Sequence, residues 1–386
     1  MIRAMRRIAV LGSTGSIGAQ TLDVARERGY RVVGLAAGAN AAKLVAQAAE
    51  FKPALVSCAA EVADAVRPHL PPGTRLASGR GAAEAVATLE ADTVVAAIPG
   101  IAGLGPTEAA LSAGRHVALA NKEAMVVAGP LMRELARSSG ARITPVDSEH
   151  SALYQCLLGE PRERVSRLVL TASGGPFLNG PDDLTNVTPE QALRHPNWGM
   201  GKKVTIDSAT LFNKGLEVLE AHFLFDMPIG RIEVVVHPES LVHGMVRFSD
   251  GAIKAQIGPH DMRLPILYAL AGPDRPPLVL EPLPLRGAWH FLEPDLERFP
   301  SLGLAYRAGE LGGLAPTFLN AADEVAVEAF LERALRFTEI ATVLAEVLAA
   351  APSGALRRED IAEADREARA LARTVVARAS REAAAL

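Results

Sequence analysis

The sequence predicts an α/β protein that begins with a doubly wound parallel sheet, continues into an α+β domain and ends in a helical bundle. Three observations support this prediction. Up to about residue 146, short apolar runs alternate with longer amphipathic stretches, a glycine-rich loop follows the first run, and the alternation stops beyond that point. Strands that are buried on both faces and alternate with helices are typical of a parallel sheet.

The first domain, residues 1–146, contains six short runs that are rich in apolar residues. The predicted strands are Ile8–Leu11, Val32–Ala36, Ala54–Cys58, Thr93–Ile98, His116–Ala120 and Ile143–Val146. Amphipathic patterns lie between them and predict helices. These patterns include Thr21–Arg28, Ala41–Lys52, Glu61–His69, Leu104–Gly114 and Ala124–Ser139.

The second domain, residues 147–272, has a different pattern. Ser208–Phe225 reads as one long helix, and Arg167–Leu170 as a strand. Three later runs predict antiparallel strands, the last two joined by a turn that contains a glycine. These runs are Ile232–Val236, Leu241–Phe248 and Ala252–Ile257.

Residues 273–300 contain seven prolines, a density that opposes both helices and central strands, so they predict an extended linker. Residues 301–386 then show four amphipathic helical patterns, which predict a small C-terminal bundle. The patterns are Leu302–Leu314, Phe318–Glu332, Thr338–Ala350 and Asp360–Ala384.

Composition narrows the class of protein. A net charge of -4 gives no reason to expect nucleic acid or an anionic membrane as a partner. The apolar run after the N-terminal arginines ends at Gly12, too soon for a signal peptide, and no segment approaches the roughly 18 apolar residues of a membrane span. With only two cysteines, Cys58 and Cys156, we expect a cytoplasmic protein in a reducing compartment.

A glycine loop, Gly12-Ser13-Thr14-Gly15-Ser16-Ile17-Gly18, follows the first predicted strand and opens a helix. Glycines let the backbone turn sharply and approach a pyrophosphate, which then meets free N–H groups at the helix N-terminus. At the start of an alternating α/β pattern, the loop predicts a Rossmann-like dinucleotide-binding domain. The alternative is a plain tight turn.

The end of the second strand bears on the choice of dinucleotide. NAD-preferring folds usually carry an acidic residue there for the ribose 2′-hydroxyl. Here the segment is Ala37-Gly38-Ala39-Asn40, with no acid and with Lys43 one turn later. This arrangement weakly favours NADP, and a Gly-Asn turn without a ligand is the alternative.

Three carboxylates, from Asp147, Glu149 and Glu217, indicate a site for a hard metal ion. Asp147 and Glu149 follow a predicted strand at its carboxyl end, where ligands bind in parallel sheets. Asn213 lies four residues before Glu217 and therefore on the same helix face. An oxygen-only set suits Mg²⁺ or Mn²⁺ better than zinc. The alternative is a set of unrelated solvated acids.

Three further stretches are candidates for contact with substrate. Ser173, followed by two glycines, offers a hydroxyl and N–H groups to an anion. The glycine-hinged loop from His195 to Lys202 carries Trp198 and predicts a lid, with a core tryptophan as the alternative. Lys122 ends a strand of the first domain and can hold a substrate oxygen, or it is simply a charge at a helix start.

These motifs resemble the 1-deoxy-D-xylulose 5-phosphate reductoisomerase family. Six of them occur in the family's order, and the resemblance extends through the proline-rich segment to Leu319-Asn320-Ala321-Ala322 in the helical tail. The six motifs are Gly12–Gly18, Asn121–Glu123, Asp147–His150, Ser173–Phe177, His195–Trp198 and Asn213–Glu217.

The resemblance implies a homodimeric NADPH enzyme of the non-mevalonate isoprenoid pathway. Such an enzyme rearranges the phosphorylated sugar 1-deoxy-D-xylulose 5-phosphate to a branched aldehyde and reduces it to 2-C-methyl-D-erythritol 4-phosphate. Asp147, Glu149 and Glu217 resemble the ligands of Mg²⁺ or Mn²⁺, with Co²⁺ as a further option.

The resemblance also implies roles for the other candidate residues. Lys122, Ser148 and Lys214 resemble contacts to substrate hydroxyl and carbonyl oxygens, and the loop with Trp198 resembles a lid over the site. Four residues resemble those that bind the substrate's phosphate group in the family: Ser173, His195, Ser208 and Asn213. Ten residues resemble those that contact the dinucleotide in the family: Thr14, Gly15, Ser16, Ile17, Gly38, Ala39, Asn40, Asn121, Glu123 and Gly201.

Two residues depart from the family's pattern. Ala39 stands where many members have a basic residue, which leaves the source of 2′-phosphate selectivity open. Asp323 stands where asparagine is usual, for which we expect no catalytic consequence.

Two other functions remain as alternatives. A metal-free dehydrogenase of the semialdehyde or homoserine type also begins with a glycine-rich turn, and a non-catalytic NADP-binding sensor would bind cofactor without oxidising it.

Overall fold

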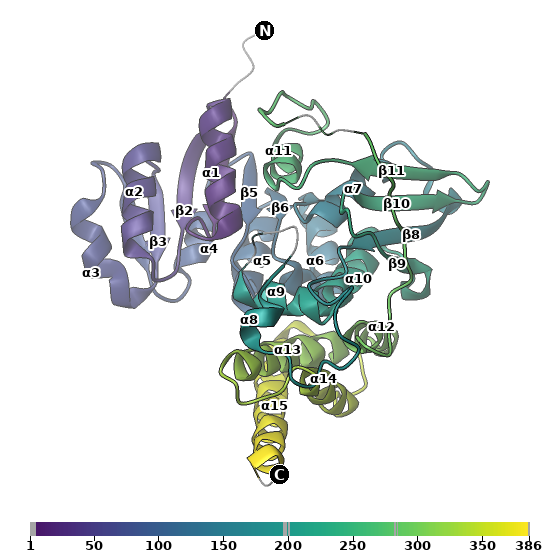
Figure 1. The fold of residues 1–386 in the computed structure, drawn as a ribbon. Coiled ribbons are helices and arrows are strands. Elements are labelled where there is room, and N and C mark those ends of the chain that lie inside the picture. The colour runs from purple at the N-terminus through teal and green to yellow at the C-terminus, as the bar shows by residue number, and fades with distance from the viewer. Residues whose placement is uncertain (1–4, 196–198, 200, 282, 284, 385–386) are drawn as a thin grey trace. The chain divides into compact units, whose positions relative to one another are not determined.

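The structure is a computed structural model that describes residues 5–195, 199, 201–281, 283 and 285–384 (Figure 1). The chain forms two compact units, which are treated separately below. The first comprises the described residues of Met1–Ala124, Pro130–Tyr154 and Asp261–Glu281. The second comprises those of Met125–Gly129, Gln155–His260 and Pro282–Leu386.

The first unit is built on a seven-stranded sheet in the order β4-β3-β2-β1-β5-β6-β7, in which every neighbouring pair is parallel. This confirms the predicted doubly wound sheet. The order reverses between β1 and β5, and such a switch point is where open α/β sheets bind ligands. The strands are β1 (Arg7–Leu11), β2 (Arg31–Ala36), β3 (Leu55–Cys58), β4 (Arg75–Ser78), β5 (Thr93–Ala96), β6 (His116–Leu119) and β7 (Ile143–Pro145).

Strand β4 and the short helix after it were absent from the sequence-based prediction. β4 is an edge strand whose four residues, Arg75 to Ser78, are all exposed or half-buried. It therefore lacks the apolar run that marked the other strands. The helices that contribute to this unit are α1 (Ser16–Arg28), α2 (Ala41–Phe51), α3 (Ala63–Val66), α4 (Ala82–Ala87), α5 (Leu104–Ser112), α6 (Lys122–Ser139), α7 (Ser148–Leu157) and α11 (Arg263–Ala271).

Helix α11 lies in the first unit although it is distant in sequence. Its Ile266 and Leu270 are buried in the same apolar cluster as Ile8, Val10 and Leu35 of the sheet. Each such side chain contributes about 1.5–3 kcal/mol when it is removed from water. The sequence-based prediction placed residues 263–271 in the second domain. Packing between segments that are far apart in sequence produces no local sequence pattern that could have shown otherwise.

The second unit contains a four-stranded sheet in the order β11-β10-β8-β9. β10 pairs antiparallel with β8 and β11, as predicted for the β10–β11 hairpin. The antiparallel prediction for Ile232–Val236 is wrong, because this strand pairs parallel with β8. A long helical crossover separates the two strands, and such connections join parallel strands. The strands are β8 (Val165–Ala172), β9 (Ile232–Val236), β10 (Val242–Phe248) and β11 (Ile253–Ile257).

The predicted single helix Ser208–Phe225 is also wrong. Two helices meet here, α9 (Lys202–Ala209) and α10 (Phe212–Phe225), because Leu211 adopts a left-handed conformation with φ of 58°. The Thr210 hydroxyl accepts a hydrogen bond from the Phe212 N–H at 3.3 Å, which satisfies one of the free donors at the start of α10.

The C-terminal region of the second unit is helical, as predicted. Helix α13 packs against α12, α14 and α15, and it buries most of its length. The described residues of 273–300 carry no helix or named strand, as predicted for an extended linker, and Leu292 forms an isolated bridge with Val236. The remaining helices are α8 (Pro189–Ala192), α12 (Ser301–Leu311), α13 (Ala315–Leu331), α14 (Glu339–Ala349) and α15 (Ile361–Ala384). Among the described helices, none has the length and apolar character needed to cross a bilayer.

Candidate active site

The glycine loop of the first unit is shaped by close backbone packing. Gly12 has φ of 81°, and a Cβ atom there would lie 2.3 Å from the Ala97 carbonyl oxygen. A Cβ atom on Gly18 would lie 2.2 Å from the carbonyl oxygen of Gly12. Both positions therefore require glycine. The loop ends at Ser16, where helix α1 begins. Thr14, Gly15, Ser16 and Ile17 form the turn and the first helical residues, where N–H groups suit a pyrophosphate.

A buried side chain of α2 fixes the same loop. The Ser13 hydroxyl donates to Oε1 of Gln47 at 2.8 Å, and Nε2 of Gln47 donates back to the Ser13 carbonyl at 2.8 Å. Both residues are buried. Sequence reasoning missed Gln47, because a lone glutamine in a helical pattern has no motif to distinguish it.

The residues after β2 are exposed, and one of them has a structural role. Asn40 caps helix α2, with its side chain accepting from the Lys43 N–H at 3.1 Å. The Lys43 ammonium donates to the Thr14 carbonyl at 2.8 Å, which places its charge on the glycine loop. Gly38 and Ala39 precede the cap and are both exposed. A base therefore lies beside the loop while the acid typical of NAD-preferring folds is absent from Ala37–Asn40.

Asn121, Lys122 and Glu123 open helix α6. The Asn121 side chain accepts from the Ala124 N–H at 2.6 Å and donates to the Gly100 carbonyl at 2.9 Å, so it joins the loops after β5 and β6. Glu123 is buried in the first helical turn.

Lys122 and Asp147 form a partly buried ion pair. The Lys122 ammonium lies 2.5 Å from Oδ2 of Asp147, and about one-seventh of each side chain is exposed, at 13% and 16%. Ser148 and Glu149 begin α7, and the Ser148 hydroxyl donates to Oε2 of Glu149 at 2.5 Å. Glu149 therefore lies in the first turn of α7, where a helix N-terminus favours negative charge.

In the second unit, Asn213, Lys214 and Glu217 meet on α10 as predicted from their spacing. Nδ2 of Asn213 donates to one oxygen of Glu217 at 2.6 Å, and the Lys214 ammonium donates to the other. Lys214 and Glu217 are almost fully buried. A buried charge is stable only when it is paired, and these two contacts hold both oxygens of the carboxylate in one orientation.

Ser173, His195 and Ser208 belong to a second polar group in this unit. The Ser173 hydroxyl lies 3.1 Å from Nε2 of His195 and accepts from the Gly175 N–H at 3.2 Å. A Cβ atom on Gly175 would lie 2.7 Å from the carbonyl oxygen of Ser208, so this loop packs directly on the end of α9. Burial, and secondarily the nearby His260, lowers the pKa of His195, which favours the neutral ring.

Gly201 is the N-cap of α9, at the end of the predicted lid. Trp198 lies outside the described residues.

The fold and these groups define a dinucleotide-binding oxidoreductase with a second, acid- and lysine-bearing α+β unit. Comparison with known proteins gives the family. Three family models match, described as 1-deoxy-D-xylulose 5-phosphate reductoisomerase over residues 8–129, its C-terminal domain over 143–225, and the DXP reductoisomerase C-terminal domain over 257–371.

Named relatives and solved structures agree. The 1-deoxy-D-xylulose 5-phosphate reductoisomerase of Thermus thermophilus is 59% identical over 95% of this chain and 98% of its own, and that of Chlorobium phaeobacteroides is 51% identical over 97% and 100%. The Zymomonas mobilis enzyme in complex with NADPH has a TM-score of 0.90 at 41% identity, covering 96% of this chain and 99% of its own. The chain belongs to the 1-deoxy-D-xylulose 5-phosphate reductoisomerase family.

Proposed function

We propose that this protein converts 1-deoxy-D-xylulose 5-phosphate into 2-C-methyl-D-erythritol 4-phosphate, with NADPH as reductant and a divalent metal ion as cofactor. The reaction belongs to non-mevalonate isoprenoid biosynthesis. One observation carries the proposal: the family match extends over both units and the helical tail. The acid, amide and lysine of α10, which meet in the arrangement that the motif predicted, support it.

NADPH is assigned to the first unit. A solved relative is described in complex with NADPH, and here the glycine loop has the tight turn and the uncapped helix start that a pyrophosphate needs. We assign the contacts to the loop, to the end of β2 and to two other helix starts, α6 and α9. The residues are Thr14, Gly15, Ser16, Ile17, Gly38, Ala39, Asn40, Asn121, Glu123 and Gly201.

The metal ion is assigned to Asp147, Glu149 and Glu217. Relatives are described in complex with magnesium, and the carboxylate oxygens present here fit a hard cation such as Mg²⁺ or Mn²⁺. When bound, the ion supplies a Lewis acid that polarises the substrate's oxygens. Two of the acids already lie against lysines, which balance their charge. Those lysines, Lys122 and Lys214, together with Ser148, are assigned to hold the substrate's hydroxyl and carbonyl oxygens.

The phosphate group is assigned to Ser173, His195, Ser208 and Asn213. The neutral His195 ring and the Ser173 hydroxyl lie in contact and can each donate a hydrogen bond to an oxyanion. Binding of the phosphate at a distance from the reacting carbons orients the sugar for rearrangement. We assign the loop with Trp198 to closing over the substrate and excluding water before hydride transfer.

The alternative of a metal-free semialdehyde or homoserine dehydrogenase is not favoured. It leaves the paired acids and lysines of both units without a role, and the family match extends over the second unit and the helical tail as well as over the nucleotide-binding part.

We further propose a cytoplasmic homodimer. β11 is an edge strand whose Ile253 and Ile257 are 51% and 41% exposed, and an exposed apolar edge is a template for pairing with another strand. We assign a second copy of the chain as the partner of this edge strand. Sedimentation of the parent and of Ile253→Lys tests the dimer, since a dimer that pairs through this edge dissociates in the variant.

The cytoplasmic location is supported by the cysteines. Both cysteines are buried free thiols, as suits a reducing compartment.

The proposed function is tested by NADPH oxidation with 1-deoxy-D-xylulose 5-phosphate and Mn²⁺. We expect turnover that EDTA abolishes and that Mn²⁺, Mg²⁺ or Co²⁺ restores. Turnover that survives EDTA would support the metal-free alternative. NADPH binding without oxidation would support a sensor.

A further inference from the structure

A buried charge cluster joins helix α9 to helix α13 within the second unit. The Lys203 ammonium lies 2.6 Å from Oδ2 of Asp207, one turn along α9, and 2.5 Å from Oδ2 of Asp323 on α13. The side chains of Asp207 and Asp323 are 2% and 0% exposed. Lys203 also lies over the ring of Phe212, 5.7 Å from its centroid. None of these charged residues has a role in the proposed reaction.

The cluster holds two carboxyl groups and one ammonium, so full ionisation would leave a net negative charge in a buried site. Burial, and then the neighbouring Asp207, raises the pKa of Asp323 well above its usual value. A protonated Asp323 can accept from Lys203 with one oxygen and donate to Asp207 with the other. That arrangement gives each polar group a partner and makes the cluster neutral.

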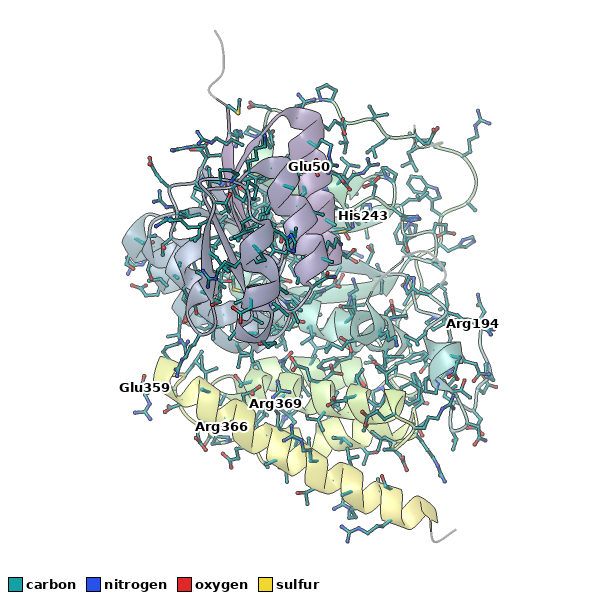
Figure 2. All side chains as sticks on the ribbon, turned by 90° about the vertical axis from the view of Figure 1, so that its left-hand side faces the viewer. Glu50, Arg194, His243, Glu359, Arg366 and Arg369 are labelled. Carbon is teal, nitrogen blue, oxygen red and sulfur yellow. The ribbon has the colours of Figure 1, made fainter. Side chains whose placement is uncertain are left out.

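Other charges around α13 do not enter the cluster. Glu324, the next residue of α13, pairs with Arg369 of α15 at 2.5 Å, and Arg369 also pairs with Asp365. Figure 2 labels Arg369 on the yellow C-terminal helix. The buried residues of α12 and α14 carry no titratable group. Within the described residues, the charges that act on Asp323 are therefore those of Lys203 and Asp207.

The cluster lies directly beside the assigned phosphate end. Ser208 follows Asp207 in the last turn of α9, and its backbone is packed against Gly175, in the loop that carries Ser173. Movement of α9 along α13 would therefore displace Ser208 relative to Ser173. The contact between Lys203 and Asp323 links the two helices at this point.

We propose that Lys203, Asp207 and Asp323 form a proton-dependent clamp that positions Ser208 for the substrate's phosphate group. The inference rests on the proposed function, which assigns Ser208 to that phosphate. Asp323 is a positioning residue in this clamp and does not touch substrate. Loss of its proton places two buried carboxylates in repulsion, loosens the link between α9 and α13, and weakens phosphate binding.

Asp323→Asn tests the clamp, because the carboxamide reproduces the acceptor and donor of the protonated acid and cannot titrate. KM and kcat for 1-deoxy-D-xylulose 5-phosphate are measured with Mg²⁺ over the whole range of pH above 3.8 in which the parent and the variant stay active. We expect the ratio of parent KM to variant KM to rise about tenfold across the range, while the kcat ratio changes less than about twofold. Titration of the substrate's own phosphate cancels in the ratio.

Asp365→Asn is the matched control, since it makes the same substitution in the helical bundle at an acid paired with Arg369. Its KM ratio to the parent should not change with pH. Asp323→Leu removes the contact between Lys203 and α13, leaves Lys203 only Asp207 of the two acids, and should raise KM at every pH.

Thermal unfolding supplies a readout that does not need activity. The folded pKa of Asp323 is raised, so the stability of the parent relative to Asp323→Asn falls as the pH rises above 3.8. A KM ratio that is constant with pH would overturn the clamp, whether or not the melting difference changes and whether or not Asp323→Leu folds. A parent that does not turn over the substrate would instead overturn the proposed function and, with it, the assignment of Ser208.

Discussion

The two candidate regions of this protein are built in different ways. In the first unit, the glycine loop is a backbone structure, whose shape depends on missing Cβ atoms at Gly12 and Gly18. In the second unit, the group on α10 is a side-chain structure, in which Asn213 and Lys214 hold the two oxygens of Glu217. The shape of the glycine loop is therefore disturbed by an added side-chain atom at Gly12 or Gly18. The group on α10 is instead disturbed by the loss of a charge or of a hydrogen bond.

This difference predicts distinct failures. An added methyl group in the loop should harm both folding and cofactor binding, because the backbone itself must move. Replacement of the Glu217 carboxylate by an amide should harm chemistry while the fold survives, because the amide oxygen can still accept a hydrogen bond from the buried Lys214.

The largest effect is expected for Glu217→Gln. The change keeps size and removes one charge from the assigned metal ligands, so turnover should fall about a thousandfold, or ~4 kcal/mol of transition-state stabilisation. Steady-state assays with Mg²⁺ and Mn²⁺ measure it, with circular dichroism to verify the fold. Glu160→Gln, in an exposed pair with Lys254, is the control and should keep parental activity. Near-normal turnover of Glu217→Gln would remove this residue from the site.

The next effect is expected for Gly18→Ala. Its Cβ atom would overlap the Gly12 carbonyl, so the loop must shift, and NADPH affinity should fall about a hundredfold with a loss of ~1–3 kcal/mol of stability. Fluorescence titration with NADPH and urea unfolding measure the two effects. The control is Gly303→Ala in α12, where an added Cβ meets nothing within 4 Å and alanine favours the helix. Unchanged NADPH affinity in Gly18→Ala would show that the loop is not the cofactor site.

A third prediction separates the two units by pH. His116 lies between Thr93 and Thr144 of the neighbouring strands, and burial, followed by Arg142, lowers the pKa of this histidine to about 4. The pKa of His116 is lower in the folded protein than in the unfolded chain, so protonation favours the unfolded chain. The stability that the neutral ring confers is therefore complete above pH 6.5 and is lost as the pH falls towards 4. The first unit should lose stability as the pH falls below 6.5, whereas the Asp323 cluster should lose stability as the pH rises above 3.8.

Urea unfolding at several pH values tests this difference. The parent should lose up to ~3 kcal/mol more than His116→Asn between neutral pH and the folded pKa. His69→Asn, at an exposed position of the same unit, should leave the slope unchanged. Equal slopes for the parent and His116→Asn would show that the histidine is not held neutral.

The same contrast explains what could be predicted from the sequence. The strands of the first sheet were identifiable because burial on both faces demands continuous apolar runs, and the Asn213–Glu217 contact followed from helix periodicity alone. β4, α11 and the break at Leu211 were missed, since an exposed edge, a distant packing partner and a single left-handed residue leave no periodic signal. Gln47 and the Lys203 cluster were missed for a related reason, because their partners lie 34 and 120 residues away.

The smallest effect is expected for Lys43→Met, which tests whether the first region selects its dinucleotide. The Lys43 ammonium lies on the loop carbonyl of Thr14, close to where the ribose of a dinucleotide is expected, and the acid typical of NAD sites is absent. Removal of the charge should lower the ratio of kcat/KM for NADPH to that for NADH about threefold to tenfold, because a 2′-phosphate contributes binding only where a cation meets it. Lys52→Met at the other end of α2 is the control and should keep the parental ratio. An unchanged ratio in Lys43→Met would mean that selectivity comes from the backbone of the loop, and the first region would then depend on shape alone.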